Sequence, residues 1–271
     1  MNEIDAFYNS GVEIGRLERG LGKVEFYRTK EILRNYICKK NSVIYDVGGG
    51  VGAYSAWLAK MGMKVSLVEP AEVAVAYAKA NMKSDCSFDC EVGDARCLSF
   101  PDDSADVVLL MGPLYHLRDR KERIKTLAES RRVLKKGGLI VCAGISRYSS
   151  ATWALSVYGV KNNFLDDDIY FDMLIKEITS GDHIRPKEYP LILPEAYFTT
   201  VKEMTLEIGE AGFSVMGFHA VEGCIWMTPC LEEKWTDEKS RERLLELVRM
   251  TEHDEEMAGM SPHFLVVARK D

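Results

Sequence analysis

The sequence lacks the features that would mark a secreted, membrane-spanning or broadly nucleic-acid-binding protein. It contains no Cys-x-x-Cys pair, and its seven cysteines are an odd number, which argues against a complete set of disulfides. No apolar run approaches the length that crosses a bilayer, and residues 1–20 contain no apolar signal core. The formal net charge of -7 gives no broad basic surface, without excluding a local basic patch. We therefore expect a cytoplasmic protein with no membrane contact.

The composition and the residue spacing also bound the architecture. A chain of 271 residues with 46% hydrophobic residues can bury one large core, so we expect a single domain with insertions. No metal is expected, because the His, Asp and Glu residues show no convincing ligand spacing. A thiol site at Cys86, Cys90 and Cys97 is conceivable. The alternation of Cys86, Phe88, Cys90 and Val92 with polar residues instead favours one face of a half-buried strand.

Strand and helix patterns alternate between residues 43 and 143, as is typical of a doubly wound α/β sheet. We expect the first five strands at 43–45, 65–68, 87–92, 106–111 and 139–143. Helices are expected at 53–59, 71–82 and 118–134, the last one ended by Gly137 and Gly138. A helix at 200–211 and strands at 213–221 and 263–269 complete the pattern. The predicted fold is Rossmann-like, with a mostly parallel seven-stranded sheet and helices on both faces.

The most informative segment is Asp46-Val-Gly-Gly-Gly-Val-Gly-Ala53, which joins an acidic strand end to a glycine turn and a helix start. Glycines in such a turn permit unusual φ values and let a ligand approach the backbone. Gly48, Gly50 and Ala53 also satisfy the dinucleotide pattern G-x-G-x-x-G/A, and Glu69 follows about twenty residues later. Asp46 argues against a pyrophosphate, because its carboxylate would repel phosphate charge. A cationic nucleoside ligand fits this turn better.

With these residues the sequence resembles the class I S-adenosylmethionine-dependent methyltransferases. Glu69, at the end of the second strand, matches the family's second signature, and Gly93-Asp94-Ala95 matches the third. The resemblance implies that Glu69 binds both ribose hydroxyls and that the Asp94 region holds the adenine amino group. Glu69 would otherwise be a helix N-terminal acid, and Asp94 a turn residue. The implied cofactor is S-adenosylmethionine, with S-adenosylhomocysteine as product.

The resemblance also supplies a set of candidate cofactor-binding residues. These are Tyr27, Arg28, Asp46, Gly48, Gly49, Gly50, Tyr54, Glu69, Pro70, Gly93, Asp94, Ala95, Met111 and Gly112. Arg28 could pair with the carboxylate of the cofactor, as an arginine of a preceding helix does in many relatives. A solvated helix arginine is the alternative.

The chain divides into a cofactor-binding core and three further segments. We expect an N-terminal helical cover at 1–40, the core at 41–145, an insertion at 146–199, and C-terminal strands at 200–271 with an insertion at 222–261. The first insertion leaves the sheet after the fifth strand, at the edge where such sheets bind ligands. We interpret it as a lid or substrate cover because it is rich in aromatic residues, namely Tyr148, Trp153, Tyr158, Phe164, Tyr170, Phe171, Tyr189, Tyr197 and Phe198.

Chemistry is expected directly after the fourth strand. Methyltransferases of base or amide nitrogens often carry Asp/Asn-Pro-Pro-Tyr there, whereas this chain has Gly112-Pro113-Leu114-Tyr115. That difference weakens an amide or base substrate. His116 is a candidate general base for a hydroxyl or a protonated amine, or else a structural histidine at a strand-to-helix corner. Tyr115 could line the acceptor pocket or fill the core.

The sequence as a whole resembles a bacterial subgroup of small-molecule-type methyltransferases, to which we attach no substrate. Further matching segments are Met111 to Leu117, Glu207 to Phe213 and Glu222 to Trp226. We expect methyl transfer to an O, N or other nucleophile of a small, partly apolar or aromatic metabolite. The alternatives are an RNA or protein methyltransferase and a regulator that binds S-adenosylmethionine without catalysis.

Overall fold

A seven-stranded, mostly parallel sheet forms the centre of the molecule. The computed structural model describes residues 7–156, 164–190 and 192–271. The strands lie in the order β3-β2-β1-β4-β5-β9-β8, and β9 is antiparallel to both of its neighbours. Their bounds are β1 (Val43–Val47), β2 (Lys64–Glu69), β3 (Asp89–Val92), β4 (Ala105–Leu110), β5 (Leu134–Ile145), β8 (Phe213–Ala220) and β9 (His263–Lys270). The predicted doubly wound fold is confirmed.

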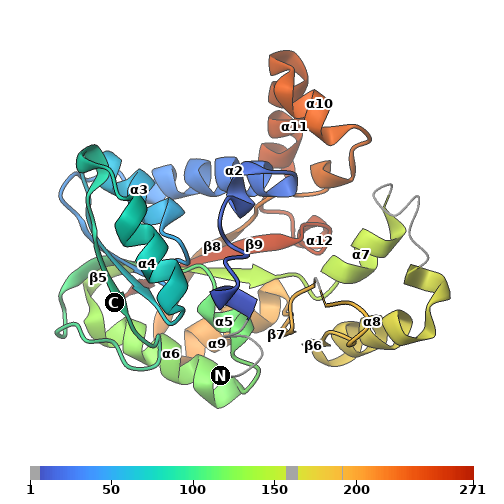
Figure 1. Cartoon of the computed structure of the whole chain (residues 1–271). Coiled ribbons are helices and arrows are strands. Elements are labelled where there is room, and N and C mark those ends of the chain that lie inside the picture. Colours follow the sequence, from blue (N-terminus) through green and yellow to red (C-terminus); the bar gives the residue numbers. More distant parts are fainter. Residues whose placement is uncertain (1–6, 157–163, 191) are drawn as a thin grey trace.

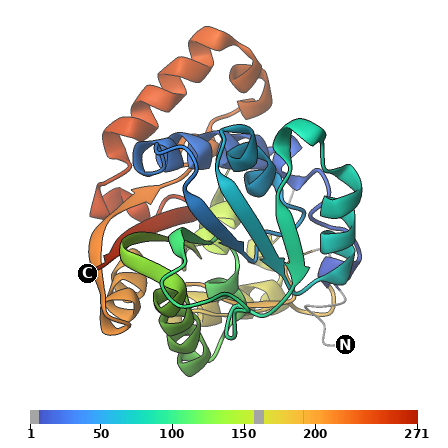
Figure 2. The ribbon, with the colours of Figure 1, turned by 90° about the vertical axis from the view of Figure 1, so that its left-hand side faces the viewer.

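Helices cover both faces of this sheet. Figure 1 shows α2 (Leu21–Tyr36), α3 (Ala53–Lys60) and α4 (Glu72–Asn81) on one face, with α6 (Arg120–Val133) and α9 (Val201–Glu210) on the other. The same layers are seen end-on in Figure 2. Two hydrophobic cores therefore lie back to back, with the sheet between them.

The central strands are apolar throughout because both of their faces are covered. In β4, Val107 and Leu109 pack against the α2 side, while Val108 and Leu110 pack against the α6 side. All four side chains are buried. A parallel strand between two helical layers is expected to read as a continuous hydrophobic run rather than an alternating one.

Several predicted boundaries were wrong at the ends of elements. The strand β5 begins at Leu134, directly after α6, so Gly137 and Gly138 lie within the strand and do not end a helix. Leu134 is fully buried and pairs with Ala105, which draws the chain into the sheet at once. The predicted helix at 118–134 starts only at Arg120, where Asp119 caps it by accepting a hydrogen bond from the Lys121 N–H.

The predicted third strand is shorter than expected. Cys86 lies in a short 3-10 helix, Ser84–Cys86, and the strand begins at Asp89. Val92, which was expected on the buried face, is 52% exposed because β3 is an edge strand of the sheet. Cys90 remains half-buried and Cys97 is exposed, so these cysteines do not share one buried face.

Both insertions fold into compact helical units beyond the sheet (Figure 1). The first contains α7 (Ser149–Leu155), η4 (Phe164–Asp166), α8 (Asp168–Ser180), β6 (Asp182–Ile184) and β7 (Glu195–Tyr197). Its aromatic residues cluster with one another, as Phe164 stacks on Tyr170 with ring centroids 4.4 Å apart. Tyr158 lies outside the described residues.

The second insertion contains η5 (Ile225–Met227), α10 (Leu231–Thr236), α11 (Glu238–Thr251) and α12 (Glu255–Ala258). Leu244 and Val248 of α11 pack against Val24 of α2. This insertion connects the end of β8 to the start of β9, which are antiparallel neighbours in the sheet. It therefore leaves the sheet and returns to it at the same edge, beside α2. Within the described part of the chain, no helix combines the length and the hydrophobicity needed to cross a bilayer.

Substituting Gly49 by alanine should destabilise the fold. An added Cβ would lie 2.5 Å from Leu67 Cδ1 and 2.6 Å from Asp46 Cγ, and both of those side chains are fully buried. Overpacking of this kind costs about 1–3 kcal/mol, measurable by urea denaturation. As a control, Gly209→Ala on the exposed face of α9 has no described atom within 4 Å of its added Cβ and should raise stability by about 0.5–1 kcal/mol. Equal effects of the two variants would contradict this account.

Candidate functional site

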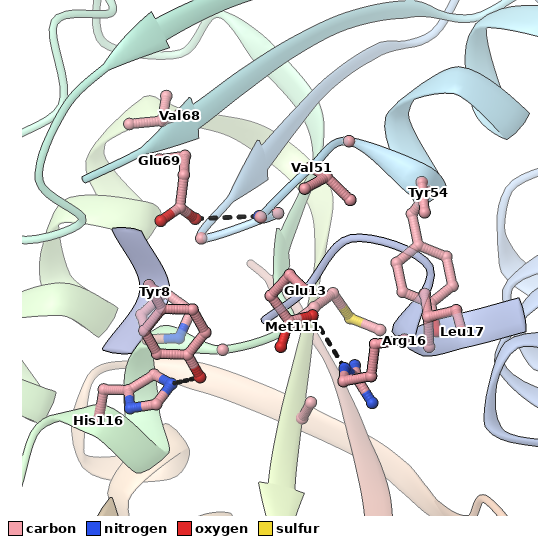
Figure 3. Close-up of a pocket in the computed structure, with 18 of the residues that line it drawn as sticks. Tyr8, Glu13, Arg16, Leu17, Val51, Tyr54, Val68, Glu69, Met111 and His116 are labelled. Atoms are coloured by element: carbon pink, nitrogen blue, oxygen red, sulfur yellow. Dashed lines mark hydrogen bonds and ion pairs between the residues drawn. The ribbon is translucent and has the colours of Figure 1, made fainter. Parts of the chain in front are cut away.

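A cavity of about 490 Å³ lies at the edge of the sheet where the parallel strands end. This is the edge at which open α/β sheets bind ligands, and the volume is in the range of small-molecule sites. Many of the residues predicted from the sequence line it, namely Gly48, Gly49, Gly50, Tyr54, Glu69, Pro70, Gly93, Asp94, Ala95, Met111, Gly112, Tyr115 and His116. In Figure 3, Glu69 lies on one side of this space, and Tyr54 and Arg16 lie on the other.

The glycine turn forms the floor of the cavity between β1 and α3. Gly48 and Gly50 have φ values of 71° and 58°, a region that side-chain-bearing residues rarely adopt. A Cβ on Gly48 would lie 2.6 Å from the ring of Pro113, so this position also requires the absence of a side chain. The backbone of the turn is therefore open to close approach by a ligand.

The Glu69 carboxylate faces this turn from the end of β2. One oxygen accepts a hydrogen bond from Gly50 N at 2.9 Å, drawn in Figure 3, and the other accepts one from Ala71 N at 3.1 Å. Burial raises the pKa of Glu69, although these two N–H groups oppose the shift. Each oxygen keeps a further lone pair, so the carboxylate can accept two more hydrogen bonds from a ligand.

Asp46, which was predicted as a cofactor-binding residue, does not line the cavity. Its carboxylate is fully buried beneath the turn and accepts a 2.6 Å hydrogen bond from Ser55 Oγ of α3. Burial raises the pKa of Asp46 to about 6, against the effect of the Ser55 hydrogen bond. The side chain lies behind Gly49 because β1 directs it toward the helical layer, so it supports the turn from below.

Gly93, Asp94 and Ala95 lie at the far end of the cavity, after β3. The Asp94 carboxylate is exposed and forms an ion pair with Arg96 at 2.6 Å. Hydrogen bonding to Arg96 is the main cause that lowers the pKa of Asp94, so it is an anion at neutral pH. Arg96 also reaches Glu122 of α6 at 2.9 Å, which ties this loop to the helix.

Tyr27 and Arg28, which were predicted as cofactor-binding residues, do not line the cavity. Tyr27 packs edge-on against Trp235 of the second insertion, with ring centroids 5.6 Å apart. The buried Arg28 forms ion pairs with Glu31 and Glu252 and donates from Nε to Val221 O at 3.2 Å. Arg28 therefore anchors the second insertion to α2.

An N-terminal segment that the sequence motifs did not identify as a binding site covers the cavity instead. Tyr8, Glu13 and Arg16 line it on the side facing the glycine turn and Glu69 (Figure 3). Arg16 donates from Nε to Glu13 at 2.8 Å and from Nη1 and Nη2 to Glu25 at 2.6 and 3.0 Å. A cover at 1–40 was expected, but no recognisable motif contains these residues, so none of the three was predicted as a site residue. The described residues of the first insertion do not line the cavity, although Arg185 lies over the Phe7 ring, 5.9 Å from its centroid.

His116 and Tyr115 belong to the short helix α5 (Pro113–His116), directly after β4. The Tyr8 hydroxyl lies 2.8 Å from His116 Nε2. Within the described structure, the buried Nδ1 of His116 has no hydrogen-bond partner. Burial lowers the pKa of His116 to about 4, so the ring is neutral at physiological pH. The Tyr115 hydroxyl donates to Met111 O at 3.0 Å, and burial raises its pKa.

A second histidine, His263, lines the cavity from the start of β9 and was not predicted as a site residue. Its Nδ1 lies 2.7 Å from Glu222 Oε1, and Glu222 is fully buried. Burial opposes the charge of His263, but Glu222 and Glu25 outweigh it and raise its pKa to about 9. His263 is therefore an imidazolium at neutral pH.

Two groups of side chains in the described structure have metal-ligand types close together, although the sequence spacing showed none. Glu25, Glu222 and His263 form one group, and His219, Glu252 and His253 form the other; in each, the candidate ligand atoms lie within 4.8 Å of one another. Arg16 pairs with the first group and Arg28 with the second. These cations already compensate the carboxylates.

Comparisons with known proteins agree with this geometry. Residues 45–142 match a methyltransferase domain. The chain is 31% identical over 120 residues to a ubiquinone biosynthesis O-methyltransferase of Rhizobium leguminosarum bv. trifolii, covering 44% of this chain and 46% of that one. It is 36% identical over 103 residues to a 2-methyl-6-phytyl-1,4-hydroquinone methyltransferase of Synechocystis sp., covering 38% and 31%. The chain thus matches less than half of the length of each of these curated relatives.

The fold is shared with a solved S-adenosylmethionine-dependent methyltransferase from Methanosarcina mazei. The TM-score is 0.58 at 22% identity, covering 88% of this chain and 96% of that one. The methyltransferase domain at 45–142, the names of these relatives and the shared fold together indicate the class I S-adenosylmethionine-dependent methyltransferases. The implied cofactor is S-adenosylmethionine, and the open glycine turn beside the free lone pairs of Glu69 fits a nucleoside of that kind.

The charge on His263 should make stability fall at alkaline pH. Because its pKa of about 9 lies above the ~6.5 of an unfolded histidine, its contribution is complete below about pH 6.5 and is lost as pH rises through about 9. The expected contribution is about 3 kcal/mol at most. Urea denaturation at pH 6.5 and 9.5 should show a larger loss for the wild type than for His263→Gln. Parallel losses would show that His263 does not carry this charge.

Proposed function

We propose that the protein transfers a methyl group from S-adenosylmethionine to an O, N or other nucleophile of a small, partly apolar or aromatic metabolite. The observation that carries this proposal is the single continuous cavity that joins the glycine turn and Glu69 to His116 and Tyr8. One end of the cavity has the features of a nucleoside site. The other end has titratable groups, His116 and Tyr8.

The half of the cavity proposed to bind the cofactor is formed by residues at or just after the ends of β1, β2 and β3. S-adenosylmethionine would supply a methyl group already activated by its positively charged sulfur. Glu69 would accept hydrogen bonds from the ribose hydroxyls, and Gly93, Asp94 and Ala95 would border the adenine. The fixed negative charges of Glu69 and Glu13 favour a cationic ligand over a phosphate-bearing one.

At the acceptor end, His116 is the proposed base. It is neutral across the physiological range, and a hydroxyl that receives a methyl group becomes a strong acid that a weak base can deprotonate. The Tyr8 hydroxyl is hydrogen-bonded to Nε2 of His116, so the acceptor oxygen would not reach this nitrogen directly. The acceptor oxygen would instead give its proton to Tyr8, while Tyr8 gives its own proton to His116. Tyr115 would hold Met111 in place and line the pocket. Alignment of donor and acceptor and exclusion of water would supply the rest of the rate.

The lining of this half supports a partly apolar acceptor. Leu17, Met111, Ala143, Val221 and Leu265 all contribute to it. The curated relatives are named for ubiquinone and hydroquinone methylation, which involves aromatic or quinone-type rings. A ring-bearing metabolite is therefore the proposed acceptor class. The seven free cysteines favour the cytoplasm as the compartment.

The two alternatives have less support. An RNA or protein methyltransferase would need a wider binding surface, and the net charge of -7 disfavours a polyanion. A regulator that binds the cofactor without catalysis would need no neutral histidine beside the acceptor space. It would show cofactor binding without methyl transfer across a broad panel of acceptors.

Glu69→Gln should weaken cofactor binding. The amide loses one hydrogen-bond-accepting oxygen and the negative charge, a loss of about 1–3 kcal/mol, or about 5- to 150-fold in Kd. Calorimetry with S-adenosylmethionine and S-adenosylhomocysteine measures it. The matched control is Glu72→Gln, an exposed residue of α4 that does not line the cavity and should leave Kd unchanged. Binding of NAD but of neither adenosyl ligand would reject the proposed function.

His116→Ala should lower turnover by about 100-fold or more, because a positioned base is lost, while the Kd for S-adenosylhomocysteine changes little. Tyr8→Phe should give a similar loss if the proton passes through its hydroxyl. Transfer of labelled methyl groups to a panel of phenols, catechols and amines measures both variants. Wild-type turnover in His116→Ala would remove His116 as the base.

A further inference from the structure

The part of the cavity farthest from Glu69 is walled by strands on the other side of β1. Met111 follows β4, Ala143 lies near the end of β5, and His263 and Leu265 begin β9. Since β9 is antiparallel, its first residues lie at the edge where β4 and β5 end. Neighbouring strands are about 4.8 Å apart, so four spacings separate β2 from β9 by about 19 Å. A ribose held by Glu69 would thus be well separated from His263, so the acceptor would contact this wall.

His263 is held rigidly at this wall by Glu222. Glu222 Oε1 lies 2.7 Å from Nδ1 of the ring, and Oε2 accepts from the His263 backbone N at 3.1 Å. Ser261 Oγ lies 3.1 Å from the same Oε2. The fully buried carboxylate therefore has both oxygens engaged, and it fixes the orientation of the ring.

The second ring nitrogen of His263 is the available donor at this end of the cavity. Among the described residues, no hydrogen-bond partner is recorded for Nε2, and 27% of the side chain is exposed while it lines the cavity. The charged groups that face the ring are Glu222 from the β8–β9 connection, Glu25 from α2 and Arg16 from η1 (Arg16–Glu18). Arg16 and Glu25 satisfy each other through two hydrogen bonds. The two carboxylates keep His263 protonated, so Nε2 carries a hydrogen to donate.

A bound divalent cation is a weaker interpretation of the same residues. Glu25, Glu222 and His263 approach one another within 4.8 Å, but both Glu222 oxygens already accept hydrogen bonds and Glu25 is paired with Arg16. A metal would also have to displace a proton from His263. Among these described groups, the donor that still needs a hydrogen-bond acceptor is instead the cationic Nε2–H of His263.

We propose that His263 is a specificity-determining residue whose Nε2–H donates a hydrogen bond to a phenolic oxygen of the acceptor ring. This inference rests on the methyltransferase function proposed above. The surrounding charges favour a neutral oxygen over a full anion, because Glu13, Glu25 and Glu222 outnumber Arg16 and His263 by one. The apolar neighbours of His263 would contact the ring itself. His263 takes no proton in this scheme, since that role falls to His116.

The test uses two probes of similar shape, 4-ethylphenol and ethylbenzene, titrated into protein saturated with S-adenosylhomocysteine and followed by NMR. His263→Gln should weaken 4-ethylphenol binding about tenfold or more, as expected for loss of a hydrogen bond to a charged donor. Ethylbenzene binding should change less than about twofold. His253→Gln, at a histidine with 61% side-chain exposure outside the cavity, is the control and should leave both affinities unchanged.

The pH dependence supplies a readout that requires no variant. In the wild type, 4-ethylphenol affinity should fall between pH 7 and 9.5 as Nε2 loses its charge, whereas ethylbenzene affinity should not. In His263→Gln the fall should be absent. In Glu222→Gln it should move to lower pH, because the carboxylate that stabilises the imidazolium is gone.

Three outcomes would overturn the inference while leaving the cofactor assignment intact. In the first, the wild type binds S-adenosylhomocysteine but binds 4-ethylphenol and ethylbenzene equally well, or binds neither. The second is an identical pH profile in the wild type and His263→Gln. The third is binding of Mg²⁺ or Zn²⁺ that is lost in His263→Gln. Failure of the wild type to bind S-adenosylhomocysteine would instead reject the proposed function itself.

Discussion

The buried carboxylate of Asp46 is the contact on which the ligand-binding edge depends. It ends β1, accepts a hydrogen bond from Ser55 of α3 and lies against Gly49 of the turn, so one side chain holds the strand, the turn and the helix together. The turn can then present its backbone upward to the cavity. The charge of Asp46 also contributes to the electrostatic potential in the cavity, because only the backbone of the turn separates the two and the interior has a low dielectric constant. A residue predicted to bind a ligand thus supports the surface that does so.

The opposite wall of the cavity depends on charges from segments that are far apart in the sequence. Glu13, Arg16, Glu25, His263 and Glu222 alternate in sign from the N-terminal cover, across the start of α2, to the β8–β9 connection. Each charge has an opposite neighbour, which offsets the cost of taking it out of water. These ion pairs tie the residues just before α2 to the core. Such contacts leave donors and acceptors facing the cavity.

The sequence predicted the sheet, and many of the predicted cofactor residues line one cavity, because that information is local. Glu69 and Asp94 each follow a recognisable strand, and parallel strand ends must meet at one edge. In the acceptor half, His116 and Tyr115 were predicted, but His263 and Glu25 were not, since they are brought together only by the return of the second insertion. The position of Arg28 outside the cavity follows from its place on the helix. Residues four apart on α2, such as Glu25 and Thr29, share the face that lines the cavity, whereas Arg28 is rotated by 100° from Thr29 toward Glu252.

The cavity shows how the surroundings of a histidine, rather than the residue itself, decide its role. His116 is buried beside the uncharged hydroxyl of Tyr8, with no carboxylate among the causes of its pKa shift, so desolvation alone acts and the ring is neutral. His263 is also desolvated, but two carboxylates face it and the ring is charged. One ring can therefore receive a proton while the other can only donate a hydrogen bond. The presence or absence of nearby carboxylates thus gives two histidines that line one cavity different charge states.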